Sequence, residues 1–113
     1  GEVFVSILLN KIDITSCSGW QTFYQINNSN SKELAKYIQE NLNTTIESNK
    51  SREILPLTGK YLMDNIKIPT VTVECGFLSN NSDLTNLKNS SYQEKLAWGI
   101  YEGIIDYFSN PML

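Results

Sequence analysis

The residues best suited to chemistry lie in one short segment, residues 68–80, with the sequence IPTVTVECGFLSN. A β-branched apolar run in this segment ends in a single carboxylate, Glu74, and a glycine follows two residues later. Because α/β proteins form their sites at the carboxyl ends of strands, a carboxylate here is a candidate general acid or base. The structural alternative is an acid that caps a neighbouring helix or pairs with a lysine or arginine.

The chemistry open to Glu74 is restricted because the chain contains no histidine, the commonest acid–base group and metal ligand. The two cysteines, Cys17 and Cys75, are far apart and do not form a zinc-binding pattern. A disulfide between them stays open, although we expect two reduced thiols, with Cys75 buried. Neighbouring residues of a strand point to opposite faces, so Cys75 should not share a site with Glu74.

Composition and charge argue against two kinds of partner. The 113 residues carry a net charge of −3 without a cluster of Lys and Arg, so we expect no nucleic-acid binding. No apolar run approaches the roughly 20 residues that a membrane-spanning helix needs. The first residues also lack a charged and then apolar leader pattern, so we expect no signal peptide.

The hydrophobic patterns predict the element order β, β, α, α, β, α, α, which is typical of an α/β domain. The expected strands cover residues 3–9, 20–25 and 70–73, and the expected helices cover about 30–42, 58–65, 84–88 and 91–108. Residues 3–9 are almost continuously apolar. This predicts a strand buried on both faces, within a twisted, largely parallel sheet flanked by helices. Residues 1–113 should form a single domain.

The two long helices have sequence signals for their first turns and their buried faces. Asn30 with Glu33, and Ser91 with Glu94, resemble capping boxes. The first helix should bury Leu34, Ala35, Ile38 and Leu42 and leave Gln39 on the polar face. The core-facing residues expected in the last helix are Leu96, Ala97, Ile100, Ile104, Tyr107 and Phe108.

The strand predicted over residues 3–9 needs neighbours on both sides, yet the chain offers few strands. Either the partner strands are missing from this chain or another copy supplies them. A truncated sheet would expose an apolar edge and face. We therefore expect a homodimer, a domain swap or aggregation.

Four segments resemble zinc-dependent N-acetylmuramoyl-L-alanine amidases of the Amidase_3 type, which are cell-wall hydrolases. Residues 5–10 (VSILLN) resemble the family's Ser-[Ile/Leu]-His-x-Asn segment, and residues 19–24 (GWQTFY) its glycine-plus-aromatic strand. Residues 31–35 (SKELA) match its Ser-x-x-Leu-Ala helix start. Residues 68–80 resemble its Pro-x-[Val/Ile]-Leu-[Val/Ile]-Glu-x-Gly-Phe-[Leu/Ile]-Ser-Asn signature. The resemblance covers essentially the whole chain and is closest to the spore-cortex amidases of endospore formers.

The resemblance implies a truncated amidase fold, the C-terminal part of a catalytic domain, and a specific chemistry. In the family, His, Glu and His hold one Zn²⁺, which polarises the amide carbonyl and acidifies a water. A catalytic Glu takes the water's proton and passes one to the leaving amine. The bond cut joins the muramic acid lactyl group to L-Ala, in peptidoglycan or a muramyl peptide. The family suggests the cell envelope, outside the cytoplasm or associated with the forespore.

Only one catalytic position of the family is kept in this sequence. Glu74 matches the catalytic Glu, while Leu8 occupies the position of the second His ligand. The other two ligands belong to a region that would precede Gly1. A leucine cannot bind zinc, so we expect no zinc in this chain and no activity from it alone.

Four further residues match positions that would bind substrate or shape the site: Asn10, Arg52, Ser79 and Asn80. Each has a structural alternative. Asn10 could end a strand, Arg52 could be a solvated charge, and Ser79 with Asn80 could start a helix.

Three function classes stay open for the chain. It could be part of a peptidoglycan amidase, a degenerate homologue that acts as a non-catalytic cell-wall or partner-binding module, or a hydrolase that uses Glu74 without zinc. The third is the weakest, because amide hydrolysis needs electrophilic stabilisation worth about 3–4 kcal/mol for even one donor.

Overall fold

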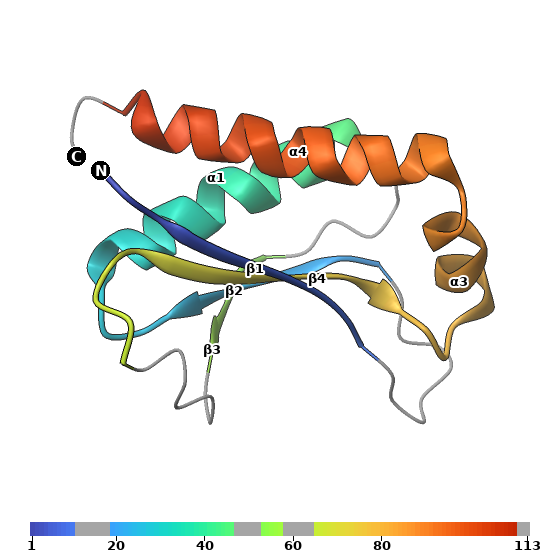
Figure 1. Ribbon diagram of the computed structural model, residues 1–113, viewed down its shortest axis with the longest axis horizontal. Coiled ribbons are helices and arrows are strands. Elements are labelled where there is room, and N and C mark those ends of the chain that lie inside the picture. The colour runs from blue at the N-terminus through green and yellow to red at the C-terminus, as the bar shows by residue number, and fades with distance from the viewer. Residues whose placement is uncertain (11–18, 47–52, 58–64, 111–113) are drawn as a thin grey trace.

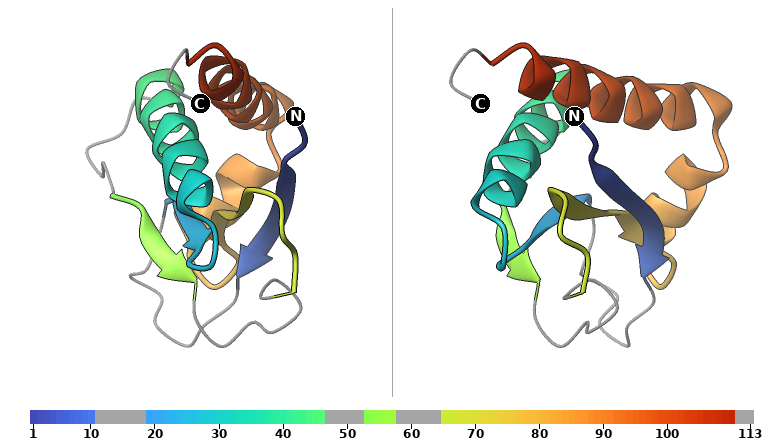
Figure 2. Two further views of the ribbon diagram at one scale, coloured as in Figure 1. Left: turned by 90° about the vertical axis from the view of Figure 1, so that its left-hand side faces the viewer. Right: turned by 60° about the vertical axis from the view of Figure 1, so that its left-hand side comes forward.

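Two long helices, α1 and α4, cover one face of a four-stranded sheet (Figure 1). The computed structural model describes residues 1–10, 19–46, 53–57 and 65–110. Its strands are β1 (Phe4–Asn10), β2 (Gln21–Gln25), β3 (Leu55–Leu57) and β4 (Thr70–Phe77). Its helices are α1 (Ser29–Thr45), α3 (Asn81–Leu87) and α4 (Ser90–Phe108). Figure 2 shows both long helices on the same side of the sheet, which confirms the predicted α/β class.

The strand order is β1-β4-β2-β3, so β4 lies between β1 and β2. β1 pairs with β4 in parallel, as β2 does with β3, whereas β2 and β4 are antiparallel. The sheet is therefore largely parallel, as expected, and the central β2–β4 pair is the antiparallel exception. The alternation of apolar residues along a strand is the same whether the strand runs parallel or antiparallel to its neighbour. The sequence pattern therefore could not predict that β2 runs antiparallel to β4.

β1 is an edge strand among the described strands, since it pairs with β4 alone. The prediction that this strand is buried on both faces is wrong, because Phe4, Ile7 and Leu9 are 40%, 60% and 46% exposed. β3 was not predicted, since it has only three residues and includes Pro56. The helix expected over residues 58–65 lies almost entirely outside the described residues.

Each long helix begins after an asparagine whose side chain caps its first turn. The Asn28 side chain accepts a hydrogen bond from the Asn30 backbone N–H at 2.8 Å. The Asn89 side chain accepts one from the Tyr92 N–H at 3.1 Å. The capping boxes predicted at Asn30 and Ser91 are therefore wrong by two residues, because an earlier asparagine, itself a favoured N-cap residue, takes the role.

The core lies between the sheet and the two long helices. It contains Trp20, Leu34, Ala35, Ile38, Leu42, Ile46, Val71, Val73, Cys75, Leu96, Ile100 and Tyr107. The predicted face of α1 is confirmed, but Gln39 is also buried, at 2% exposed. In α4, Ala97 and Phe108 are exposed rather than in the core. The two helices are close, because a Cβ atom added at Gly103 would lie 2.5 Å from the Ile38 Cα atom.

Candidate functional site

Glu74 lies on β4, is half-buried, and stands in the middle of a row of three residues across the sheet. It is directly opposite Leu8 of β1 on one side and Gln21 of β2 on the other. Directly opposed residues on neighbouring strands point to the same face. We call Leu8, Glu74 and Gln21 the Glu74 row. The structure thus brings together two residues that the sequence analysis singled out separately.

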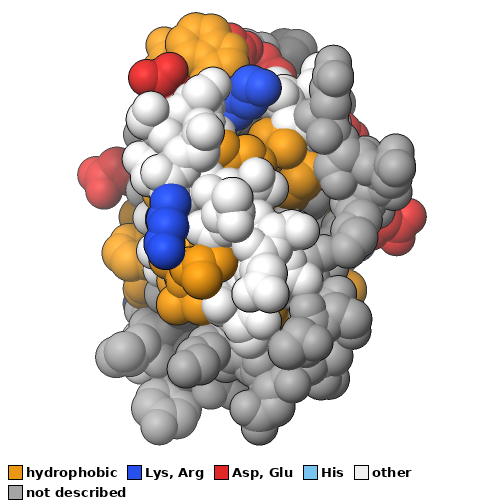
Figure 3. Space-filling model, turned by 90° about the vertical axis from the view of Figure 1, so that its right-hand side faces the viewer, with side chains coloured by type: hydrophobic (Ala, Val, Ile, Leu, Met, Phe, Trp, Pro, Cys, Tyr) orange, Lys and Arg blue, Asp and Glu red, His pale blue; other side chains and the backbone are white. Residues whose placement is uncertain are grey.

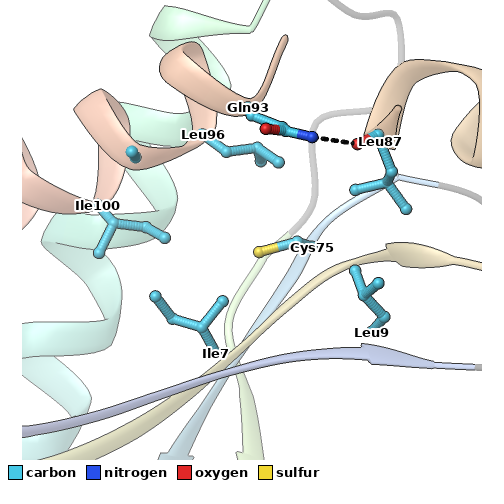
Figure 4. Close-up of a pocket in the computed structure, with 8 residues that line it drawn as sticks. Ile7, Leu9, Cys75, Leu87, Gln93, Leu96 and Ile100 are labelled. Carbon is cyan, nitrogen blue, oxygen red and sulfur yellow. Dashed lines mark hydrogen bonds between the residues drawn. The ribbon is translucent and has the colours of Figure 1, made fainter. Parts of the chain in front are cut away.

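The Glu74 row faces away from α1 and α4. Val71, Val73 and Cys75 belong to the core beneath these helices, and alternation along β4 turns Glu74 to the other face. The predicted burial of Cys75 is confirmed, and burial raises the pKa of its thiol to about 11. Figure 4 shows the Cys75 sulfur among apolar side chains. Cys75 and Glu74 therefore belong to different sides of the sheet, as expected.

Glu74 is the one member of the row able to exchange protons. Leu8 contributes an alkyl side chain. The Gln21 side chain is buried at 6% exposed, and its Nε2 atom donates a hydrogen bond to the Glu53 carbonyl at 2.6 Å. An uncharged amide held in this way orients neighbouring groups but does not act as a base at neutral pH.

The donor set around Glu74 does not fit a catalytic zinc ion. Such an ion takes three protein ligands from His, Cys, Asp or Glu and keeps one open position. The row supplies one carboxylate beside an alkyl and an amide group, and no three potential ligand side chains gather elsewhere in the described parts of the chain. The residues of the Glu74 row therefore do not form a zinc site.

The end of β4 is held by a buried carboxylate, Asp83 of α3, which sequence reasoning missed. Both of its oxygens accept from the Gly19 N–H, at 3.1 and 3.0 Å, and Oδ2 also accepts from the Phe77 N–H at 2.8 Å. Asp83 thus fastens Gly19, two residues before β2, to Phe77, the last residue of β4. Gly19 has φ of 92°, a left-handed conformation that favours glycine.

A local signal for Asp83 was present in the sequence. Asn80 precedes it by three residues, and the Asn80 side chain accepts from the Asp83 N–H at 3.0 Å, as an N-cap residue does. An acidic residue in a first helical turn is favoured by the helix dipole. The contact with Gly19 spans 64 residues, and nothing in the local pattern predicts it.

Polar side chains of α1 position the strands that carry the row. Ser31 is fully buried, and its hydroxyl accepts from the Thr70 N–H at 2.8 Å, at the start of β4. The Gln39 Oε1 atom accepts from the Thr22 N–H in β2 at 2.9 Å. The Gln39 side chain thereby supplies the hydrogen-bond acceptor for a backbone N–H of β2, which explains why this polar residue is buried.

The four predicted substrate-binding residues have different positions. Asn10 ends β1 opposite Phe77. Ser79 lies in the turn after β4 and is half-buried, while Asn80 caps α3, so the helix-start alternative is correct for Asn80. Arg52 lies outside the described residues. Asn10 and Ser79 both come after the members of the Glu74 row in their chain segments. They therefore lie toward the end of the sheet where the parallel strands β1 and β4 finish.

On the face shown in Figure 3, the Lys and Arg side chains lie singly among polar and hydrophobic ones. Within the described residues, no helix combines the length and the apolar character that crossing a membrane requires.

The α/β fold is that of solved amidases, including one from Clostridium difficile 630 that is 28% identical to this chain with a TM-score of 0.85. Comparison with known proteins shows that it belongs to the N-acetylmuramoyl-L-alanine amidase family, which it matches over residues 1–106.

Two similar proteins come from Bacillus subtilis and Clostridioides difficile. The chain is 42% identical over 108 residues to the germination-specific N-acetylmuramoyl-L-alanine amidase of Bacillus subtilis (strain 168), covering 96% of this chain and 45% of that protein. It is 45% identical to the CwlD amidase from Clostridioides difficile, solved in complex with the GerS lipoprotein, with a TM-score of 0.90. That match covers 95% of this chain and 54% of the solved one. The chain therefore spans about half the length of these relatives.

A third relative, the amidase LytC of Bacillus subtilis, is 33% identical over 109 residues, which cover 95% of this chain and 22% of LytC. The likeness is therefore shared by amidases of different length. It confirms the resemblance drawn from residues 5–10, 19–24, 31–35 and 68–80.

Proposed function

We propose that this chain is the C-terminal part of a peptidoglycan amidase and carries its general base, Glu74. The reaction is hydrolysis of the amide between the lactyl group of N-acetylmuramic acid and L-Ala. Glu74 takes a proton from the attacking water and passes one to the leaving amine. By itself the chain is inactive, because the row beside Glu74 offers no group that polarises the amide carbonyl.

The pairing of Leu8 with Glu74 is the observation that carries this proposal. The resemblance places a metal-binding histidine at position 8 and the catalytic carboxylate at position 74. The two positions are direct cross-strand neighbours on one face, although they are far apart in sequence. A site that needs both groups around one substrate requires such a juxtaposition.

The remaining roles are proposals on the same basis. Asn10 is the last residue of β1 and Ser79 lies in the turn after β4, and both would contact the substrate beside Glu74. Asn80 would act through the α3 cap, by fixing the loop after β4. Arg52, which lies outside the described residues, would also bind substrate. The substrate is peptidoglycan of the cell wall or spore cortex, and the protein would work in the cell envelope or the forespore.

A chimeric enzyme tests the role of Glu74. The portion of the Bacillus subtilis germination-specific amidase without a counterpart in this chain is joined ahead of residues 1–113, with Leu8→His to restore the ligand. We expect this chimera to release stem peptides from a muramyl peptide in the presence of Zn²⁺. Replacing Glu74 by Gln in it should lower the rate by about 10²–10⁴-fold, the usual contribution of a general acid–base group.

The matched controls are the same chimera with Leu8 kept and the chain 1–113 alone, both of which should be inactive. Full activity of the Glu74→Gln chimera would refute the assigned base. Zinc-independent release by the chain alone, abolished by Glu74→Gln, would support the third function class instead.

A second candidate function is a non-catalytic partner-binding module. It is favoured by Leu8 at the ligand position and by the relative that was solved with a lipoprotein. Under this alternative, residues 1–113 would bind the GerS lipoprotein in a co-elution assay while every catalytic assay, including the Leu8→His chimera, stays negative.

A further inference from the structure

We propose that the Thr72 hydroxyl positions the carboxylate of Glu74 by donating a hydrogen bond to one of its two oxygens. The other oxygen is then left for the proton transfers of the reaction. Thr72 is a positioning residue, because it acts through Glu74 and does not touch the substrate. Since this role deepens the one given to Glu74, it rests on the proposed function.

The Thr72 side chain is a buried polar group that lacks a partner. Thr72 is 4% exposed, and its Oγ1 atom has no hydrogen-bond partner among the described residues. Thr70, two residues earlier in β4, shows how such a hydroxyl is usually satisfied, since it donates to the Ile68 carbonyl at 2.8 Å. A buried hydroxyl left unpaired is costly, so one that is kept calls for a partner in the working protein.

Thr72 lies next to Glu74 on the same face of the sheet. Both residues belong to β4, and side chains two residues apart in a strand point to the same side. Their Cα atoms are about 7 Å apart in an extended strand, a separation that a long side chain such as that of glutamate spans. Rotation of the Glu74 side chain can therefore bring one carboxylate oxygen to the Thr72 hydroxyl without a change in the backbone.

The other neighbours of Glu74 on this face supply no unused hydrogen-bond donor. Leu8 has an alkyl side chain, and Gly76, the next residue of β4 on this side, has none. The Gln21 Nε2 atom already donates to two backbone carbonyls, at 2.6 and 3.4 Å. Among these neighbours, Thr72 therefore carries the donor that is left for the carboxylate.

The sequence places a hydroxyl where the family signature has an apolar residue. In the signature that residues 68–80 resemble, a leucine precedes the catalytic Glu by two residues, whereas this chain has Thr72. A leucine there would avoid burying a hydroxyl, so its replacement by threonine fits a polar role at this position. The rival partner is Ser6, which is half-buried and directly opposite Thr72 on β1.

A double-mutant cycle on residues 1–113 tests the pairing without any need for activity. Thr72→Val keeps the shape of the side chain and removes the hydroxyl, while Glu74→Leu removes the carboxylate. We expect Thr72→Val to lower the melting temperature by a few degrees when Glu74 is present, and not to lower it in the Glu74→Leu background.

Thr22→Val is the matched control for this cycle. The Thr22 hydroxyl is also buried without a described partner, but Thr22 is opposite Val73 and so belongs to the other face of the sheet. The control variant should therefore not lower the melting temperature in either background. A loss equal to that of Thr72→Val would show a general effect of removing a buried hydroxyl and would overturn the proposal.

The chimera with Leu8→His gives a catalytic readout. Thr72→Val should lower its kcat about tenfold and leave KM unchanged, because a hydrogen bond to a charged group is worth at least about this factor. Thr72→Ser keeps the hydroxyl and should restore most of the rate, which a purely structural loss of packing would not do. Thr22→Val should change neither constant.

Failure of the proposed function and failure of the positioning role give different results. An inactive chimera, together with coupling between Thr72 and Glu74 in residues 1–113, would refute the proposed function and support the pairing. An active chimera that depends on Glu74 but keeps full kcat in Thr72→Val would refute the positioning role alone. Additive effects of Thr72→Val and Glu74→Leu, or coupling of Thr72→Val with Ser6→Ala instead, would also overturn it.

Discussion

The buried carboxylate of Asp83 offers the sharpest test of how the end of β4 is held. It accepts hydrogen bonds from the Gly19 and Phe77 backbone N–H groups and is 5% exposed. In Asp83→Asn, one oxygen becomes an NH₂ donor that faces N–H donors, and the charge is lost. The oxygen that remains at the Oδ2 position can still accept from both N–H groups, but these two bonds lose their charge assistance. The new NH₂ group at the Oδ1 position is a buried donor that faces the Gly19 N–H, which costs about 1–3 kcal/mol.

The expected loss for Asp83→Asn is therefore about 2–4 kcal/mol of unfolding free energy. For a domain of this size, it corresponds to a melting temperature lower by roughly 10–20 °C. Urea unfolding followed by circular dichroism measures the free energy, and hydrogen exchange at the Phe77 amide should show the loosened strand end.

Asp106→Asn is the matched control, because Asp106 is an exposed helical aspartate that accepts one bond, from the Asn41 side chain at 3.0 Å. It should change stability by less than about 0.5 kcal/mol, as surface substitutions do. If Asp83→Asn were as mild as Asp106→Asn, the reasoning that Asp83 fastens β4 to the start of β2 would be refuted.

Two further predictions concern the helix pair and the buried thiol. Gly103→Ala should destabilise the fold by about 1–3 kcal/mol, because its Cβ would meet the Ile38 backbone at 2.5 Å. Gly99→Ala should cost clearly less, since the nearest atom, at 2.8 Å, is the end of the flexible Leu42 side chain; urea midpoints in the reverse order would contradict this. Because burial raises the pKa of Cys75 from 9.0 to about 11, the unfolded chain loses this proton first. Unfolding free energy should therefore be fully kept below pH 9 and fall between pH 9 and 11, by at most about 1.4 kcal/mol per pH unit. Cys75→Ala should remove this fall in unfolding free energy, as urea titrations at several pH values would show. The variant should keep the fall at higher pH that comes from Tyr92, whose pKa burial raises to about 12. A pH profile unchanged by Cys75→Ala would count against the burial of the thiol as its cause.

The sequence by itself determined the features that depend on local order. Cys75 was expected to be buried, and the alternation of side chains along a strand predicted that Glu74 points away from it. Helical spacing predicted the buried face of α1 in the same way. The motif around Glu74 also predicted the family, which the comparisons confirm.

Only the tertiary structure decided the features that depend on contacts between distant segments. The antiparallel pairing of β2 with β4, the edge position of β1 and the burial of Gln39 all follow from which segments meet in space. Local periodicity predicts which face of an element is apolar, but not its neighbour or its direction. For the same reason, the sequence named Leu8 and Glu74 as separate candidates, and the pairing of β1 with β4 made them neighbours.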